Sequence, residues 1–477
     1  MKYYMILILL IASIALHSEV RSVWVLPWDI VSPESIDAMI KIVVESNQNE
    51  LLVEVRYRAD ALFDTSKAGT LFPNPEPRSY ILPANGFDPL SYILTAAHAA
   101  NLKVHAWVIV FNATPLEPSL ITKNFIYTKH RDWLTCDENG DTLNGKSAFG
   151  FFVDPGVPEV QDYLLNVISN LVAGYPELDG LHLDYIRYPD TYLGYHPVSK
   201  LRYLEYCNEN GEITFNEWRI MQVSTFVQRL SSQVKSINPK LILSAAVFSD
   251  IAEANVAYAQ DWISWLQQGF VDRIYPMAYN VKFNVYKQQL DRMKMLEKDD
   301  KIIMGLRAWD QGGKSLATNG GAAYNVSDIA ARISLARQQG FGGIALFSFP
   351  GMKIGNAWKQ LTKLSYPDRE LQAIIEAPAI TADFKVRTEA NEYVIEISIP
   401  IEGRWRWEIN TGGMFYSRYR YYLEGYNRDY WNGSLDNKID FINPNLITPG
   451  NYVVRLYREN TKDSYTFPIT FEKLAKP

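Results

Sequence analysis

The amino-acid sequence predicts an α/β fold, a (β/α)8 TIM barrel, followed by a small all-β sandwich of the immunoglobulin or fibronectin kind. Eight strand-like runs between residues 21 and 350 are separated by helix-like runs. Polar residues recur at every second position of several strand-like runs, which is typical of strands with one polar face. From about residue 377 the pattern changes to short alternating runs with turn residues between them, which is typical of an antiparallel sandwich.

The order of the elements predicts the barrel. Strand-like runs lie at residues 22–28, 50–58, 103–112, 178–184, 241–248, 271–280, 301–309 and 342–350. Helical patterns lie between them at residues 35–45, 89–100, 157–172, 217–237, 261–268, 285–296 and 327–339. Alternating strands and helices form parallel βα units, and eight units close into a barrel. An open doubly wound sheet is the alternative, but Trp28 and Asp29 stand where its usual glycine-rich turn would follow the first strand.

Four connections are longer than a compact domain normally carries. They follow the second, third, fourth and seventh strands, at residues 59–88, 113–154, 188–216 and 310–325. Long loops in a compact domain are usually functional, and all four would lie at the carboxyl ends of the barrel strands. We therefore expect a deep, loop-walled cleft for an extended substrate on that face.

The first 18 residues, MKYYMILILLIASIALHS, carry one lysine and then an apolar run that ends in small residues. This pattern predicts a secretory signal peptide at residues 1–18, with an uncleaved membrane anchor as the alternative. No later run is long and apolar enough to span a bilayer. We therefore expect a periplasmic or extracellular protein without an integral membrane segment after cleavage. Its barrel domain would occupy residues 19–372 and its sandwich residues 373–477.

The composition narrows the classes of partner. The 47% hydrophobic and 21% charged fractions are typical of a globular protein, and a net charge of −6 without a basic stripe argues against binding of nucleic acid.

Cys136 and Cys207 are the two cysteines, and neither they nor the scattered histidines have metal-ligand spacing. We expect no metal or cofactor. The 30 tyrosines and 12 tryptophans are compatible with stacking on sugar rings, although rings also fill cores.

The fourth strand carries the strongest candidate for catalysis. It reads LDGLHLDYIRYPD from residue 178, and alternation puts Gly180, His182 and Asp184 on one face with leucines on the other. Asp184 ends the strand, and Tyr185 and Arg187 follow in the loop. Chemistry in (β/α)8 barrels takes place at the carboxyl ends of the strands. Asp184 is therefore the first candidate catalytic residue.

The same alternation turns further polar side chains into the barrel. They are Glu54 and Arg56 on the second strand, His105, Trp107 and Asn112 on the third, Tyr275 and Tyr279 on the sixth, and Arg307 and Trp309 on the seventh, followed by Asp310. Burying so many polar groups is costly unless they pair or bind a ligand. Structural alternatives are an ion pair between Glu54 and Arg56, a hydrogen-bonded core role for His105, and a helix-capping role for Asp310.

Glycosidic bond cleavage normally uses two carboxyl groups, one to protonate the leaving oxygen and one as nucleophile or base. Asp184 is the candidate acid, because burial against aromatic rings would raise its pKa. The candidates for its partner are Asp310, Glu54, Asp60 and Asp29, all near strand ends. A further scheme uses the acetamido group of the substrate as nucleophile, with Tyr279 positioned to hold it.

These motifs resemble the glycoside hydrolase-like family ten of bacteria. The matching pieces include VRSVWV, VEVRYRADALF, DGLHLDYIRYP and VDRIYPMAYN, and they extend over residues 19–352. The resemblance implies an exported (β/α)8 barrel acting on cell-wall glycan strands or related polysaccharides, with Asp184 as the strand-four aspartate. Many relatives have a second acid where Tyr185 stands and Gln where Glu54 stands. A distant likeness to family 18 chitinases lacks their final acid, because Ile186 occupies its place.

The first hypothesis is a secreted glycoside hydrolase that cleaves an amino-sugar-containing polymer, with Asp184, Asp310 and Glu54 as catalytic candidates. Its expected substrate-binding residues are Arg56, His105, Trp107, Asn112, His182, Tyr185, Arg187, Tyr279, Arg307 and Trp309. The second hypothesis is a non-catalytic glycan-binding protein on a degenerate barrel. A polysaccharide deacetylase or esterase is disfavoured, because the sequence has neither a metal-ligand cluster nor a G-x-S-x-G motif.

Overall fold

The computed structural model describes residues 19–73, 76–115, 117–142, 150–279, 282–308 and 326–366, together with seven strands of the C-terminal part. The chain divides into two compact units, a barrel and a C-terminal β unit, and each is described by itself. The expected signal peptide, Trp309 and Asp310 lie outside the described residues.

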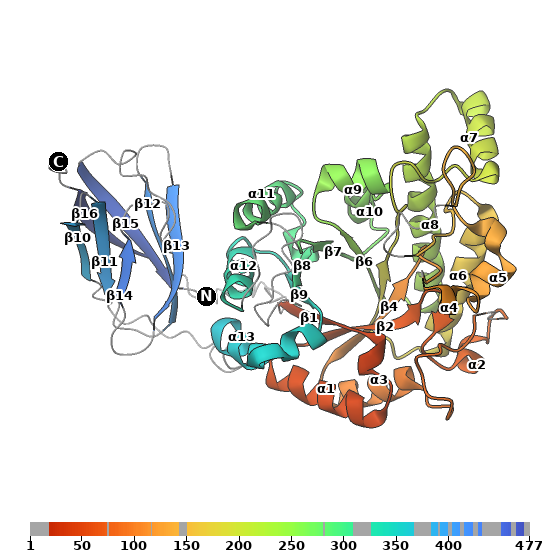
Figure 1. Ribbon diagram of the computed structural model, residues 1–477, viewed down its shortest axis with the longest axis horizontal. Coiled ribbons are helices and arrows are strands. Elements are labelled where there is room, and N and C mark those ends of the chain that lie inside the picture. Colours follow the sequence, from red (N-terminus) through yellow and green to blue (C-terminus); the bar gives the residue numbers. More distant parts are fainter. Residues whose placement is uncertain are drawn as a thin grey trace, which may run out of the picture. The chain divides into compact units, whose positions relative to one another are not determined.

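Eight parallel strands form a closed barrel, which confirms the expected fold (Figure 1). Their order around the ring is β1, β2, β4, β5, β6, β7, β8 and β9, and β9 pairs with β1 to close it. A short strand, β3 (Asp60–Ala61), adds an antiparallel hairpin to the end of β2. The barrel strands are β1 (Val20–Val25), β2 (Glu50–Tyr57), β4 (Lys103–Ile109), β5 (Gly180–Asp184), β6 (Ile242–Phe248), β7 (Arg273–Met277), β8 (Ile303–Arg307) and β9 (Gly343–Phe347).

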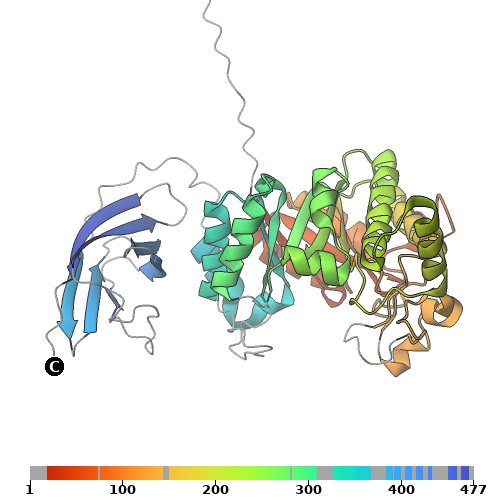
Figure 2. The same cartoon turned by 90° about the horizontal axis from the view of Figure 1, so that it is seen from above.

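Helices lie on the outer side of the ring of strands (Figures 1 and 2). The longest, α8, begins with a capping box in which Thr214 and Glu217 satisfy each other's backbone N–H groups. The helices are α1 (Pro33–Glu45), α2 (Thr65–Ala68), α3 (Pro89–Ala99), α4 (Pro118–Ile121), α5 (Phe125–Lys129), α6 (Pro158–Gly174), α7 (Pro197–Asn210), α8 (Phe215–Ile237), α9 (Ile251–Tyr258), α10 (Trp262–Gln267), α11 (Phe283–Lys294), α12 (Val326–Gln338) and α13 (Ala357–Ser365).

Three of the predicted loops contain helices: the short α2 lies in the first, the short α4 and α5 lie in the second, and the longer α7 lies in the third. Residues 188–216 were expected to be irregular, but α7 occupies 14 of them and projects at the upper right of Figure 1. Its apolar residues Val198, Leu201 and Leu204 are all more than a third exposed. The sequence pattern was weak because this helix buries little apolar surface, and burial is what produces helical periodicity.

A charged network fills the barrel at the amino ends of its strands. The buried carboxylate of Glu50 accepts hydrogen bonds from Ser22, from the Tyr275 hydroxyl at 2.6 Å and from Arg273 at 3.0 Å. His105 Nε2 lies 3.3 Å from it. Burial opposes ionisation of Glu50, but the charges of His105 and Arg273 and the two hydroxyl donors outweigh it, so its pKa is lowered.

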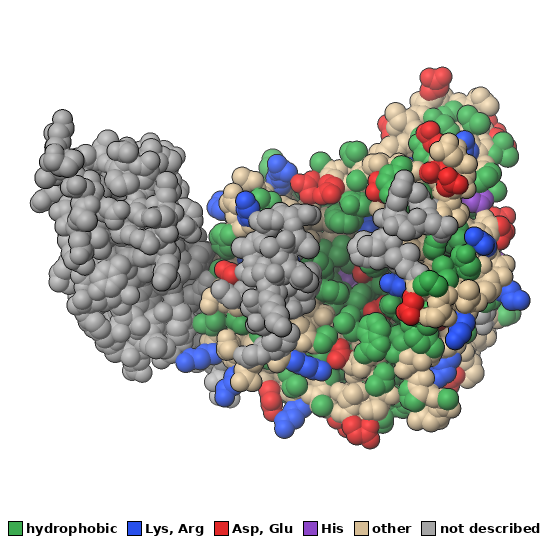
Figure 3. All heavy atoms as spheres, viewed as in Figure 1, with side chains coloured by type: hydrophobic (Ala, Val, Ile, Leu, Met, Phe, Trp, Pro, Cys, Tyr) green, Lys and Arg blue, Asp and Glu red, His purple; other side chains and the backbone are tan. Residues whose placement is uncertain are grey.

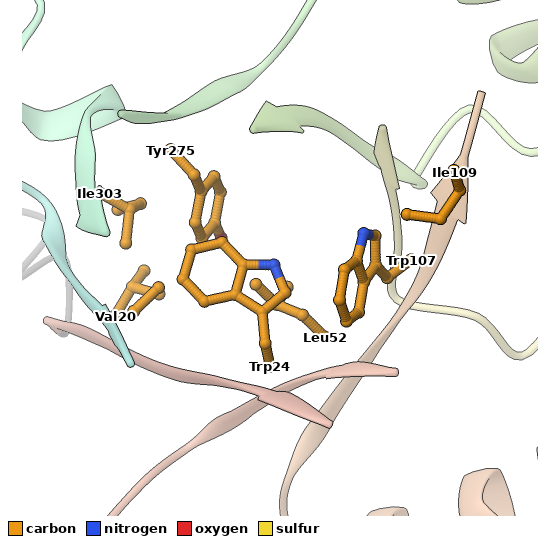
Figure 4. Close-up of a cluster of buried hydrophobic side chains, with 8 residues drawn as sticks. Val20, Trp24, Leu52, Trp107, Ile109, Tyr275 and Ile303 are labelled. Carbon is orange, nitrogen blue, oxygen red and sulfur yellow. The ribbon is translucent and has the colours of Figure 1, made fainter. Parts of the chain in front are cut away.

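Above this network, rings and aliphatic side chains pack at the barrel centre. Trp24, from β1, lies in the middle of the close-up and Trp107 approaches from β4 (Figure 4). Gly180 is required beneath them, because a Cβ atom there would come within 2.6 Å of the His105 ring. The cluster consists of Val20, Trp24, Leu52, Trp107, Ile109, Tyr275, Ile303 and Ala345.

The C-terminal unit consists of antiparallel strands, drawn in blue in Figure 2. One sheet has the order β10-β11-β14 and the other has the order β13-β12-β15-β16. The immunoglobulin-like or fibronectin-like assignment and the boundary at residue 373 stay predictions. The strands are β10 (Asp383–Glu389), β11 (Glu392–Ser398), β12 (Gly403–Asn410), β13 (Phe415–Tyr422), β14 (Arg428–Trp431), β15 (Gly450–Arg458) and β16 (Ser464–Phe471).

Two further features are the absence of a membrane-spanning helix among the described residues and the state of the two cysteines. Within the described part of the chain, no helix combines the length and apolar character needed to cross a bilayer. Cys136 is buried and Cys207 is half-buried, and both are free thiols.

Candidate active site

Asp184 ends β5 inside the barrel, as its place in the sequence predicts. Its Oδ2 accepts a hydrogen bond from the Trp107 indole at 3.2 Å, and its Oδ1 accepts one from the Tyr185 backbone N–H at 2.6 Å. Arg187 Nη1 lies 3.8 Å from the same Oδ1. Tyr185 has a φ of 51°, a conformation that costs energy for a non-glycine residue and that clusters at functional sites.

The pKa of Asp184 is raised by burial, because the charged carboxylate loses its water. The Arg187 charge and the hydrogen bonds from the Tyr185 N–H and the Trp107 indole oppose this shift by stabilising the ionised form. Asp184 is thus a buried acid whose neighbours stabilise its ionised form.

Glu54 is the second carboxyl group of this site. It lies on β2 directly opposite Trp107 in the β2–β4 ladder, so Trp107 connects the two acids. Glu54 is buried, and none of the described residues donates a hydrogen bond to its side chain. Burial raises its pKa well above the usual value, the Asp184 charge raises it further, and Arg58 acts in the opposite direction. Glu54 and Asp184 therefore form an electrostatically coupled pair.

Arg56 does not join this pair, so the expected ion pair between Glu54 and Arg56 is wrong. The β2–β4 register shifts between the two residues, and a bulge reverses the alternation of side chains. Arg56 instead forms an ion pair with Glu76 at 2.6 Å and donates to backbone carbonyls of β4 and the loop after it. The Glu76 carboxylate also accepts the Tyr163 hydroxyl of α6 at 2.5 Å. Arg56 fastens the loop after β2 to the barrel wall.

The two histidines expected to bind substrate lie below the site. His105 belongs to the Glu50 network at the amino ends of the strands. His182 accepts a hydrogen bond from the Trp24 indole at 3.2 Å and contacts the Ser244 hydroxyl at 2.9 Å. Burial, with a smaller contribution from His105, lowers the pKa of His182 well below its usual value. Both side chains are fully buried, and both nitrogens of His182 are within hydrogen-bond distance of a partner, so the two residues lie beneath the site and not in its wall.

Aromatic rings form one wall beside the acids. Tyr279 stacks on Phe347 with ring centroids 5.3 Å apart and meets Trp24 edge-on at 6.3 Å. Burial raises the pKa of Tyr279 well above its usual value, and the charges of Asp184 and Tyr185 add to this effect. Tyr279 is therefore buried within reach of the Asp184 charge, and its expected role in holding a ligand stays a prediction.

Arg187 occupies an aromatic cage on the other side of Asp184. Its guanidinium lies 4.3 Å from the Tyr185 ring centroid and 4.8 Å from that of Phe248. Cation–π contacts of this kind hold a buried arginine without consuming its hydrogen-bond donors. The cage keeps the positive charge beside Asp184.

The remaining expected residues differ in their placement. Arg307 is buried at the end of β8, opposite Phe347 in the ladder, and Asn112 is buried in a bridge to Phe152. Of the other acids, Asp29 is paired with Lys353 at 3.2 Å, and burial raises its pKa. Asp60, at the β3 hairpin, is treated below.

The sequence reasoning missed Arg58. The hairpin between β2 and β3 has a two-residue turn, Arg58 and Ala59, with φ values of 53° and 63°. Both positive values define the type I′ geometry that usually selects Asn-Gly, so the residue types gave no signal of a turn. Glu50 was also overlooked, because it begins its strand and no pattern marks it as an interior residue.

On the face drawn in Figure 3, the surface of the barrel unit is hollowed near its middle. Hydrophobic side chains line much of this hollow and a few acidic side chains are visible within it. Among the described residues, no group of three or more His, Cys, Asp or Glu side chains is arranged to hold a metal ion.

Known proteins share this fold and part of this sequence. The glycoside hydrolase domain of PgaB (BpsB) from Bordetella bronchiseptica superimposes with a TM-score of 0.54 at 14% identity, covering 73% of this chain and 100% of that domain. Glycosyl hydrolase DigH of Escherichia coli K12 is 30% identical over 226 residues, 41% of this chain and 46% of DigH. Glycosyl hydrolase YngK of Bacillus subtilis is 24% identical over 270 residues, 51% of this chain and 48% of YngK.

The matched part of this chain thus spans just under half the length of these curated relatives. The family model described as Glycosyl hydrolase-like 10 matches residues 19–308, which include every strand of the barrel except β9 and both acids of the coupled pair. The chain belongs to the Glycosyl hydrolase-like 10 family.

Proposed function

We propose that this protein is an exported glycoside hydrolase that cleaves glycosidic bonds in an amino-sugar-containing bacterial polysaccharide, peptidoglycan glycan strands or a related polymer. The observation that supports this most directly is the coupled pair of buried acids, Glu54 on β2 and Asp184 on β5, two barrel strands that flank β4. Membership of a glycosyl hydrolase-like family supports the reaction class.

The environments of the two acids divide their roles. Asp184 has two N–H donors and a nearby guanidinium, so it ionises first. Glu54 receives no such donor, and burial together with the Asp184 charge raises its pKa, so it holds its proton to higher pH than an ordinary glutamate. We assign Glu54 as the general acid for the leaving oxygen and Asp184 as the ionised partner. This reverses the assignment expected from sequence, in which Asp184 was the acid.

An ionised Asp184 has two uses in glycoside cleavage. It can attack the anomeric carbon, or it can hold the N–H of a substrate acetamido group while that group's oxygen attacks instead. Tyr279 favours the second use, because its ring stands beside Asp184 and its hydroxyl stays protonated. The stacked Tyr279 and Phe347 rings also offer a flat apolar surface to the face of a sugar.

Product analysis with matched variants tests this proposal. Purified protein without residues 1–18 would be incubated with glycan strands lacking peptides and with chito-oligosaccharides, and the products identified by mass spectrometry. The wild-type protein should release shorter saccharides, and Asp184→Asn should lose at least 10²- to 10⁴-fold of that activity, the usual contribution of one acid–base group.

Two controls make the outcome decisive. Asp29→Asn removes an acid that is already paired with Lys353 and should keep most of the activity. Circular dichroism would verify that Asp184→Asn folds. If the wild-type protein binds these glycans but releases no product from any of them, the hydrolase proposal is wrong and a glycan-binding role replaces it.

A further inference from the structure

A cavity of about 240 Å³ lies beside the β2–β3 hairpin and takes no part in the chemistry described above. The hairpin lines it on one side, and Pro115, Leu120, Lys123 and Asn124 line it on the other. Its lining residues are Tyr57, Arg58, Asp60, Pro77, Arg78, Tyr80, Pro115, Leu120, Lys123 and Asn124. The volume is below that of a site for a drug-sized ligand and suits a single sugar-sized group.

The cavity adjoins the pair of acids through Arg58. The Arg58 charge lowers the pKa of Glu54, and it also acts on Tyr57 and Tyr80 in the cavity wall. It acts on Tyr185, which follows Asp184. Arg58 thus lines the cavity and its charge also reaches Glu54, so a ligand bound here would lie near that acid.

The cavity has an excess of positive charge. The side chains of Arg58 and Lys123 form no hydrogen bond or ion pair with any described residue, although the Arg58 guanidinium lies 4.9 Å from the centroid of the Tyr57 ring. Among the described residues, Arg78 donates to the backbone carbonyls of Pro83 and Phe87. Three cations thus line a space that contains a single acid, Asp60. Burial, with the charge of Glu76, raises the pKa of Asp60 to about 7, so this acid is partly protonated near neutral pH and can donate a hydrogen bond.

The cavity also offers rings. Tyr57 is half-buried in its wall and meets the exposed Trp28 edge-on at 5.8 Å, while Tyr80 is 55% exposed. Aromatic faces next to unpaired cations are suited to a ligand with both an apolar ring face and an anionic substituent. The turn that presents Arg58 holds two non-glycine residues at positive φ, and such strain is typical of functional loops.

We propose that this cavity is a subsite for a carboxylate-bearing sugar residue of the substrate, with Arg58 binding the carboxylate, Lys123 adding charge, and Tyr57 and Tyr80 contacting the sugar ring. The inference rests on the proposed glycoside hydrolase function, because it assigns the substrate's sugar next to the cleaved bond. It narrows the substrate class to acidic amino-sugar polymers and leaves neutral ones, such as chitin, as poor ligands.

A pair of ligands that differ only in charge tests the subsite. The first is a peptide-free tetrasaccharide of alternating N-acetylglucosamine and N-acetylmuramic acid, and the second is the same molecule with its carboxyl groups reduced to alcohols. Binding to Asp184→Asn protein, which should not cleave them, would be measured by titration calorimetry. We expect at least about 10-fold tighter binding of the carboxylate form, in line with the strength of charged hydrogen bonds.

Adding Arg58→Gln should then lower affinity for the carboxylate form by roughly 10- to 100-fold and affinity for the reduced form by less than about 3-fold. Glutamine keeps the Cβ atom and most of the length, so the strain of the turn is unchanged. Arg229→Gln, on the outer helix α8 where Arg229 pairs with Asp162, is the matched control and should change neither affinity.

Equal binding of the two tetrasaccharides, no binding of either, or an equal loss for both on Arg58→Gln would overturn the subsite. An equal loss would instead mean that Arg58 acts only by tuning Glu54. Failure of the hydrolase proposal is separate and appears in another measurement. In that case the carboxylate preference and its loss on Arg58→Gln are observed, but the wild-type protein releases no product from the same tetrasaccharide.

Discussion

Glu50 and Glu54 lie on the same face of β2, four residues apart and both buried, yet their pKa values are shifted in opposite directions. Glu50 is surrounded by Ser22, His105, Arg273 and Tyr275, whose charges and hydroxyls stabilise its carboxylate. Glu54 has Asp184 as its charged neighbour. A buried acid beside positive charges and hydrogen-bond donors stays ionised and stabilises the fold. A buried acid beside another negative charge has a raised pKa and is suited to transfer a proton. One strand thus carries a structural acid at its amino end and a candidate catalytic acid at its carboxyl end.

The largest expected effect is on activity at the carboxyl end. Glu54→Gln should reduce kcat by about 10²- to 10⁴-fold with little change in KM, because it removes the proton that we assign to the leaving group. Steady-state kinetics on peptide-free glycan strands would measure it. Glu50→Gln, the same change on the same strand, is the control. The folded fraction of this variant should keep most of the wild-type kcat.

Full activity in Glu54→Gln together with an inactive Asp184→Asn would contradict this division of roles. It would show that a neutral hydrogen-bond donor suffices at position 54, in line with the Gln found there in many relatives, and it would return the acid's role to Asp184.

The second effect is on stability at the amino end. Glu50→Gln should lower the free energy of unfolding by about 3 kcal/mol, because removing one partner of a buried ion pair leaves the charge of Arg273 uncompensated. Denaturant unfolding of both variants at pH 7 would measure it. If Glu54→Gln lowers the free energy of unfolding as much as Glu50→Gln does, the structural role would not be specific to Glu50.

The prediction of this site from sequence succeeded where simple alternation holds. Asp184, Trp107 and Tyr279 were assigned inward by counting along strands, and all three lie together. Arg56 was assigned wrongly because a bulge after Glu54 reverses the count, and no residue type announces it. His105 was correctly placed inside the barrel. Alternation does not tell, however, whether a side chain lies near the amino ends or the carboxyl ends of the strands.

The loops were less predictable than the strands for a physical reason. Sequence periodicity reports burial, and α7 buries little apolar surface, while the β2–β3 turn has Arg58 and Ala59 in place of typical turn residues. Glu76 reaches Arg56 from a loop 20 residues away, a contact that depends on the path of the chain rather than on any local pattern. The fold was therefore predictable, and both acids were among the catalytic candidates, while the charges that set their pKa values were not predictable.

The third effect is an opposite pH dependence of the two glutamate variants. Glu50 has a lowered folded pKa, so its stabilisation is present above about pH 4.5 and is lost as the pH falls through that pKa. Glu54 has a raised folded pKa. The unfolded chain therefore ionises it above about pH 4.5 while the folded chain keeps it protonated, so the free energy of unfolding falls as the pH rises above about 4.5. Relative to wild type, Glu54→Gln should become more stable as the pH rises from about 4.5 to 7, while Glu50→Gln should become less stable as the pH rises from acid values toward about 4.5. Thermal unfolding across this range would measure both slopes, and slopes of the same sign would contradict the comparison.

The smallest expected effect concerns Asp60, whose surroundings mix those of the two glutamates. Burial and Glu76 raise its pKa to about 7, while Arg56 acts in the opposite direction. Tyr57 and Tyr80 are the other titratable groups that interact with it. Because the unfolded chain ionises Asp60 near pH 4 and the folded chain near pH 7, its contribution to stability is present below pH 4 and lost between pH 4 and pH 7.

Asp60→Asn removes this loss. Its free energy of unfolding should therefore rise relative to wild type as the pH increases from 4 to 8, by about 1 kcal/mol after allowance for the partial exposure of the side chain. Denaturant unfolding at pH 4.5 and pH 8 would measure the difference, with Asp37→Asn, a change at an exposed acid of α1, as the matched control outside the cavity. If Asp60→Asn gains nothing over this range, Asp60 is already ionised at neutral pH. The cavity would then present a carboxylate to its ligand, which would favour a neutral sugar over an acidic one.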